Sequence, residues 1–78
     1  MRRREETCVV TFRTTAAAMA MESACAAEGL PGRLIPVPRS VTAGCGLCWA
    51  APKERREELE ELVMKKHLAV DGIYAIIL

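Results

Sequence analysis

The stretch LIPVPRSVTAGCGLCW, residues 34–49, places two short apolar segments on either side of a loop rich in proline and glycine. Residues 33–37 predict a strand, and because Pro36 has no N–H to donate, we expect that strand at a sheet edge. Residues 47–51 predict the next strand, after a loop over residues 38–46. Two successive strands therefore occupy the middle of the chain.

The segment before this pair predicts a strand followed by a helix. Residues 7–13 are β-branched and aromatic, which favours a strand. The face of this strand expected to be buried carries Cys8, Val10 and Phe12. Thr14 or Thr15 can cap a helix over residues 16–28, which Gly29 would end. The helix face expected to be buried carries Ala17, Ala20, Met21, Ala24 and Cys25.

The segment after the pair predicts a second helix and a last strand. Pro52 suits the first turn of a helix over residues 53–68, with Glu61 and Lys65 spaced as a favourable ion pair. Its buried stripe is expected to carry Leu59, Leu62, Val63 and Val70. An Asp-Gly turn then leads to residues 73–78, a strand that is apolar on both faces.

The order βαββαβ predicts an α+β fold of ferredoxin-like type, a four-stranded antiparallel sheet with both helices on one face. The strand order expected is 4-1-3-2, within a single domain over residues 1–78 whose residues 1–6 form a flexible tail. The last strand would then be an apolar edge, which is a liability unless it is covered. We therefore expect a homodimer or another protein partner at this strand.

Composition narrows the class of partner. The net charge of +1 gives no overall attraction to nucleic acid or to a membrane surface. No apolar stretch approaches the roughly 20 residues of a membrane span, and the N-terminus lacks the apolar core of a signal peptide. We expect a cytoplasmic protein whose four cysteines are thiols, with no cofactor.

Cys45 is the candidate reactive residue, because it stands between Gly44 and Gly46 with little side-chain cover. Converging backbone N–H groups or a nearby cation would favour its thiolate. Arg39 is the candidate cation, and Pro38 stiffens the approach to it. The structural alternative is a tight turn whose cysteine only packs as a small apolar side chain.

Cys45 and Cys48 also form a Cys-x-x-Cys pair, which is compatible with thiol–disulfide exchange. Cys48 is thus a candidate resolving thiol, or only a packed side chain. A zinc site would need two further ligands, and no second paired motif supplies them, so we predict no metal. His67 is expected at a helix end, without a catalytic partner.

The runs Leu34-Ile35-Pro36-Val37-Pro38-Arg39 and Gly44-Cys45-Gly46-Leu47 closely resemble the signature of the selenium/sulfur carrier-like family of small bacterial and archaeal proteins. The resemblance implies that Cys45 carries sulfur or selenium between a donor and an acceptor protein, so that the chain is a carrier more than a turnover enzyme. Two features depart from the family pattern: Cys48-Trp49 replaces small or aliphatic residues, and Ala16-Ala17 replaces a polar position.

Two other classes of function stay open on the sequence. One is a thiol–disulfide redox module that uses Cys45 and Cys48 together. The other is an interaction domain without chemistry, in which the cysteine loop is a structural turn.

Overall fold

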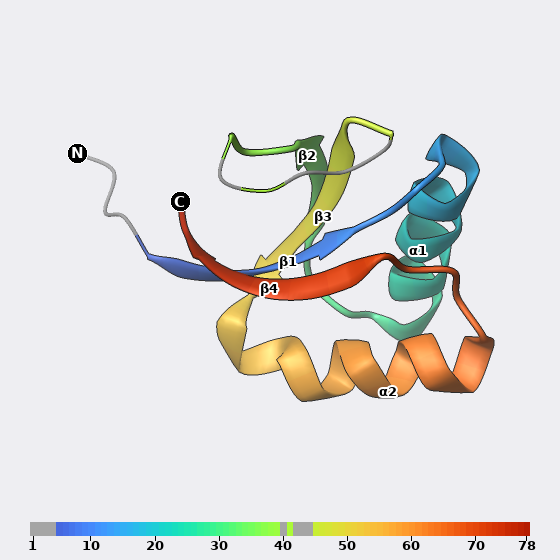
Figure 1. Ribbon diagram of the computed structural model, residues 1–78. Coiled ribbons are helices and arrows are strands. Elements are labelled where there is room, and N and C mark those ends of the chain that lie inside the picture. Colours follow the sequence, from blue (N-terminus) through green and yellow to red (C-terminus); the bar gives the residue numbers. More distant parts are fainter. Residues whose placement is uncertain (1–4, 40, 42–44) are drawn as a thin grey trace.

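The computed structural model describes residues 5–39, 41 and 45–78. In chain order the elements are β1 (Glu6–Thr11), α1 (Thr15–Glu28), β2 (Arg33–Pro36), β3 (Leu47–Pro52), the 3-10 turn η1 (Lys53–Arg55), α2 (Arg56–Lys66) and β4 (Gly72–Ile77). The predicted α+β class is confirmed, with two α-helices and a four-stranded antiparallel sheet (Figure 1).

The strands lie in the order β2-β3-β1-β4, which read from the other edge is 4-1-3-2. Every neighbouring pair is antiparallel. β2 and β4 are the two edges, so Pro36 lies in an edge strand, as predicted. In Figure 1, β4 in red forms the front edge and β2 in green the rear edge.

The ladder begins earlier than the sequence suggested. Glu6 belongs to β1, and Glu5 and Leu78 exchange backbone hydrogen bonds of 3.2 and 3.0 Å. The predicted flexible tail is therefore wrong for Glu5 and Glu6, because their backbone groups have partners in the sheet. Residues 1–4 of that tail lie outside the described residues.

The core lies between the helices and one face of the sheet, and Figure 1 shows both helices on the same side. The predicted inward face of β1 is confirmed, because Cys8, Val10 and Phe12 are all buried in this core. The other buried members are Ala18, Met21, Cys25, Trp49, Ala51, Leu59 and Leu62. On α1, Ala18 replaces the predicted Ala20, which is exposed, because the stripe of residues 18, 21 and 25 is the one that packs into the core against the sheet.

The predicted end of α1 at Gly29 is confirmed, whereas the helix begins at Thr15, one residue before the predicted start at Ala16. The Thr14 hydroxyl accepts a hydrogen bond of 3.1 Å from the Ala17 N–H, which makes Thr14 the N-cap. Gly29 ends the helix with a φ of 70°, and Leu30 donates to the Cys25 carbonyl at 2.9 Å.

The predicted second helix, residues 53–68, is wrong at both ends. Pro52 does not open a helix; it ends β3 opposite Thr7, with an extended ψ of 139°. Residues 53–55 form η1, and α2 begins only at Arg56. At the other end, His67 takes a left-handed φ of 53° and stops the helix. Val70 lies beyond the helix, but it packs against the core as predicted.

The predicted ion pair between Glu61 and Lys65 does not form. The Lys65 ammonium instead lies 3.9 Å from the Glu28 carboxylate, because the C-terminal ends of both helices bring these side chains together. The exposed pairs on η1 and α2 are Arg55 with Glu58 and Arg56 with Glu60.

Candidate functional site

The four cysteines, all within the described residues, divide sharply by burial. Cys8, Cys25 and Cys48 are buried, whereas Cys45 is only partly buried. Burial raises the pKa of the Cys25 thiol to about 11 and also raises the pKa of Cys8. For Cys8, the nearby Arg56 acts against this shift and Glu60 adds to it. The prediction that Cys8 and Cys25 are core residues is confirmed.

Cys45 stands where the connection from β2 enters β3. The Val37 N–H donates to the Gly46 carbonyl at 3.0 Å, which extends the β2–β3 ladder by one step beyond Pro36 and Leu47. Gly46 has a φ of 78°, a conformation that strains any residue with a side chain. Glycine at this position therefore lets the chain turn directly from Cys45 into the strand.

The Cys45 sulfur has one polar partner among the described residues. Its Sγ–H donates to the Leu47 carbonyl at 3.3 Å, and the side chain packs against the edge of the helix-facing core. A thiolate has no proton to donate to this carbonyl. Loss of the thiol proton would therefore break this contact.

Cys48 lies on the opposite face of β3 from Trp49, which is in the helix-facing core. Opposite its backbone stand Thr11 on β1 and Ile35 on β2. Its pKa is raised chiefly by burial and further by the charge that Cys45 carries when ionised. Both Cys45 and Cys48 are free thiols in this structure.

The structure shows no hydrogen bond between the Cys45 side chain and Arg39 or Pro38, two other predicted site residues, among the described residues. Arg39 is exposed, and within residues 5–39, 41 and 45–78 its guanidinium makes no hydrogen bond to the Cys45 sulfur. Pro38 is partly buried, and its carbonyl accepts from the Val41 N–H at 3.0 Å. Gly44 lies outside the described residues. Cys45, Gly46 and Cys48 are thus the members that the fold brings together at the start of β3.

No group of three or more His, Cys, Asp or Glu side chains gathers as a metal site in the part of the chain that the structure describes. His67, the sequence's one histidine, is exposed where α2 ends. Within the same described ranges, neither helix nor any other helical segment has the length and apolar character needed to cross a bilayer.

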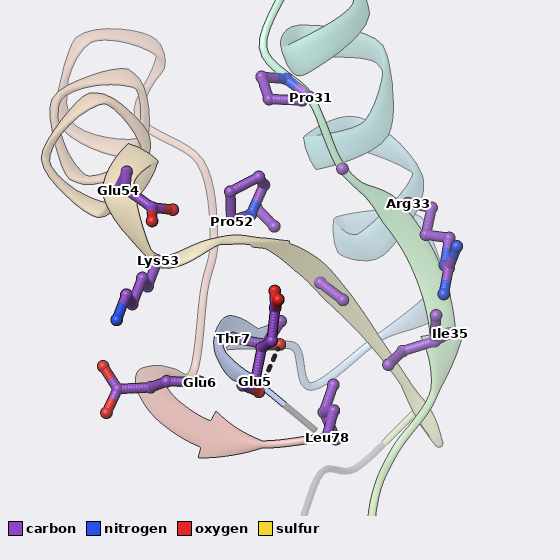
Figure 2. Close-up of a pocket in the computed structure, with 13 residues that line it drawn as sticks. Glu5, Glu6, Thr7, Pro31, Arg33, Ile35, Pro52, Lys53, Glu54 and Leu78 are labelled. Carbon is purple, nitrogen blue, oxygen red and sulfur yellow. Dashed lines mark hydrogen bonds between the residues drawn. The ribbon is translucent and has the colours of Figure 1, made fainter. Parts of the chain in front are cut away.

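A depression of about 620 Å³ lies at the other end of the sheet, where β3 and β4 finish (Figure 2). No cysteine lines it. Its polar lining includes Glu5, Glu6, Thr7, Arg33, Lys53 and Glu54. Sequence reasoning missed this depression, because its walls come from the start of β1, residues 31–35, the end of β3, η1 and Leu78, and no local motif links these segments.

Comparison with known proteins supports one family. The model of the family described as "Putative Se/S carrier protein-like" matches residues 7–75, which extends from the start of β1 to the second half of β4. No curated protein and no solved structure matches the chain.

Proposed function

Because the chain belongs to the Se/S carrier protein-like family, we propose that it carries sulfur or selenium on Cys45, as a persulfide or a selenosulfide. The observation that carries this assignment is the burial of the cysteines: the other three are sealed from solvent, whereas Cys45 is partly exposed at the end of a loop. The reducing cytoplasm is the compartment we propose, because thiols persist there.

Loading would occur by sulfur transfer from a persulfide on a donor protein. The Cys45 thiolate attacks the outer sulfur of the donor persulfide, a new S–S bond forms on Cys45, and the donor S–S bond breaks. The donor cysteine leaves as a thiolate and takes up the proton that Cys45 gave up. Attack by an acceptor thiolate on the outer sulfur of Cys45 reverses these steps, so the complete transfer needs no external oxidant or reductant.

The surroundings of Cys45 suit this exchange. Loading removes the proton that Sγ shares with the Leu47 carbonyl, so the sulfur is free to turn away from the core edge. At Gly46, apart from its chain neighbours Cys45 and Leu47, no heavy atom of the described chain lies within 4 Å of the point where a side chain would begin. We propose that an added sulfur or selenium atom occupies the space beside Gly46, which follows Cys45 in the chain. We assign Arg39, an exposed cation on the same connection, to steady the charge on that atom.

The geometry favours a carrier with one thiol over a redox pair. A resolving thiol must reach its partner and ionise, but Cys48 is fully buried and its pKa is raised. Its side chain also lies on the face of β3 away from the helices, whereas Cys45 packs at the edge of the helix-facing core. We therefore assign Cys48 to packing.

A cysteine desulfurase supplied with labelled cysteine tests the assignment. Wild-type protein is expected to gain one labelled sulfur atom, which reductant removes and intact mass spectrometry detects. Cys45→Ser is expected to gain none. Cys48→Ala serves as the matched control and is expected to load as wild type does.

Two results would contradict the assignment. Loading of Cys45→Ser at the wild-type level would remove Cys45 from the role. Loss of loading in a folded Cys48→Ala variant would instead favour the two-thiol redox module.

A further inference from the structure

The outer edge of β4 carries backbone groups that β1 does not use. Since Glu5 and Leu78 exchange both of their backbone hydrogen bonds, the β1–β4 register makes Thr7 with Ile76 the next hydrogen-bonded pair. The residues between these pairs direct their N–H and C=O groups away from β1. The residues of β4 whose backbone N–H and C=O groups point away from β1 are therefore Ile73, Ala75 and Ile77.

Only the first part of this edge is covered. The Arg56 guanidinium reaches from α2 and donates through Nη2 to the Ile73 carbonyl at 3.3 Å. A second strand could not lie against Ile73 without displacing Arg56. In the described chain, the outward groups of Ala75 and Ile77 have no such cover.

The side chains of this edge are apolar and exposed. Tyr74 is 43% exposed, Ile77 is 52% exposed and Leu78 is 37% exposed. The strand Gly72–Ile77 contains no proline and no charged residue, the two features that usually protect an edge strand from pairing. Without charge, such a strand has nothing to repel an identical strand that approaches antiparallel.

We propose that β4 pairs antiparallel with β4 of a second copy of this chain, around a twofold axis that passes at Ile76. In this register, Ala75 of each copy exchanges both backbone hydrogen bonds with Ile77 of the other copy. A twofold axis makes the contact self-complementary. Arg56 excludes the registers that require Ile73, and of the remaining registers this one uses the outward backbone groups of both Ala75 and Ile77.

The same register matches the side chains in size. Ile76 faces Ile76 of the second copy, and Tyr74 faces Leu78 of the second copy, both on the side away from the helices. On the helix side, the large Ile77 faces the small Ala75 of the other copy. The two sheets join into one of eight strands. Cys45 belongs to the β2–β3 connection at the far side of the sheet, so both thiols stay available and the dimer is independent of the carrier role.

Sedimentation equilibrium over a concentration series measures this association. Wild-type protein is expected to reach twice the monomer mass of 8.5 kDa. Ile77→Lys places a charge in the contact and is expected to give the monomer, whereas Met64→Lys, on an exposed site of α2, is expected to dimerise as wild type does. A wild-type monomer at all concentrations would overturn the proposal, as would a dimer that persists in Ile77→Lys.

Disulfide cross-linking tests the register and keeps the proposal falsifiable if Ile77→Lys fails to fold. In a Cys45→Ser background, Ile76→Cys is expected to form a covalent dimer on oxidation, because a directly opposed non-hydrogen-bonded pair brings the two Cα atoms within about 4.5 Å. Tyr74→Cys and Ala75→Cys are the matched controls and are expected to stay uncross-linked. Cross-linking through either control position instead of position 76 would overturn the proposed pairing.

Discussion

At the scale of single residues, the contrast between Cys45 and Cys48 shows how little spacing says about reactivity. Three positions separate them, yet strand alternation sends Cys48 into a fully buried position, whereas Cys45 stays at the end of the loop. A thiol without solvent resists ionisation, because burial penalises the charged form. The chemistry of a Cys-x-x-Cys pair therefore depends on the element that holds it.

Cys25 gives stability a pH dependence with a definite sign. Its pKa rises from 9.0 to about 11 in the folded protein, so between these values the unfolded chain loses a proton that the folded protein keeps. The contribution of the protonated Cys25 thiol to the free energy of unfolding is fully present below pH 9 and falls by about 2 kcal/mol by pH 11. Urea unfolding at both pH values measures this loss, and Cys25→Ala should lose correspondingly less stability over the same interval.

Two glycines with positive φ should differ in their tolerance of a side chain. At Gly32 a Cβ atom would lie 2.5 Å from Nε1 of the buried Trp49, whereas at Gly46 it would meet no described atom within 4 Å other than those of its chain neighbours. Gly32→Ala is expected to cost about 2 kcal/mol or more and to alter tryptophan fluorescence, because the indole must move. Gly46→Ala should cost about 1 kcal/mol, from backbone strain alone. Equal costs in chemical denaturation would contradict this explanation.

At the scale of elements, local hydrogen bonds set where the helices begin and end. α1 starts at a threonine side chain, but α2 has no side-chain cap at Arg55 and is preceded by η1. Pairing of Pro52 with Thr7 keeps the chain extended past the point where proline would favour a helix. The sheet thus decides where the second helix can begin.

Removal of the Thr14 cap should destabilise the protein measurably. Thr14→Ala leaves the Ala17 N–H without its side-chain acceptor and is expected to cost about 1 kcal/mol of unfolding free energy. Thr15→Ala, one position later and exposed, is the matched control and should have almost no effect. Thermal unfolding of the two variants makes the comparison, and equal destabilisation would refute the cap.

At the scale of the whole molecule, stability depends on a small core shared by the sheet and both helices. A domain of this size buries only about 60% of the surface that its unfolded chain exposes, so each core contact is a large part of the total. α2 contributes to that core through Leu59 and Leu62. Attachment of this helix is therefore a sensitive point of the fold.

Leu59→Ala should separate helix docking from helix propensity. Leu59 is completely buried, and its truncation is expected to cost about 2–5 kcal/mol because it leaves a cavity between α2 and the sheet. Met64→Ala, on the same helix but 76% exposed, should change the unfolding free energy by less than about 0.5 kcal/mol. Chemical denaturation measures both, and comparable losses in the two variants would show that the docked face has been misassigned.

The fold followed from the sequence wherever one local pattern was sufficient. Alternation placed Cys8, Val10 and Phe12 on one face, and Pro36 marked an edge strand. Predictions failed where a distant segment competed. Lys65 pairs with Glu28 of α1 and not with Glu61, its neighbour on α2. Helix periodicity alone did not select Ala18 over Ala20, because the buried stripe depends on where the sheet lies.

Some features of the candidate site likewise follow from local sequence, and others depend on distant segments. The sequence by itself determined that Cys45 stands in a glycine turn before a strand, because side-chain cover and backbone freedom are local properties. Only the tertiary structure decided that Cys48 is sealed, that Cys45 contacts the Leu47 carbonyl, and that no described residue covers the edge of β4 beyond Arg56. Those features depend on strands that pair across the chain, and the burial and hydrogen bonding of a residue are fixed only when its neighbours from distant segments are in place.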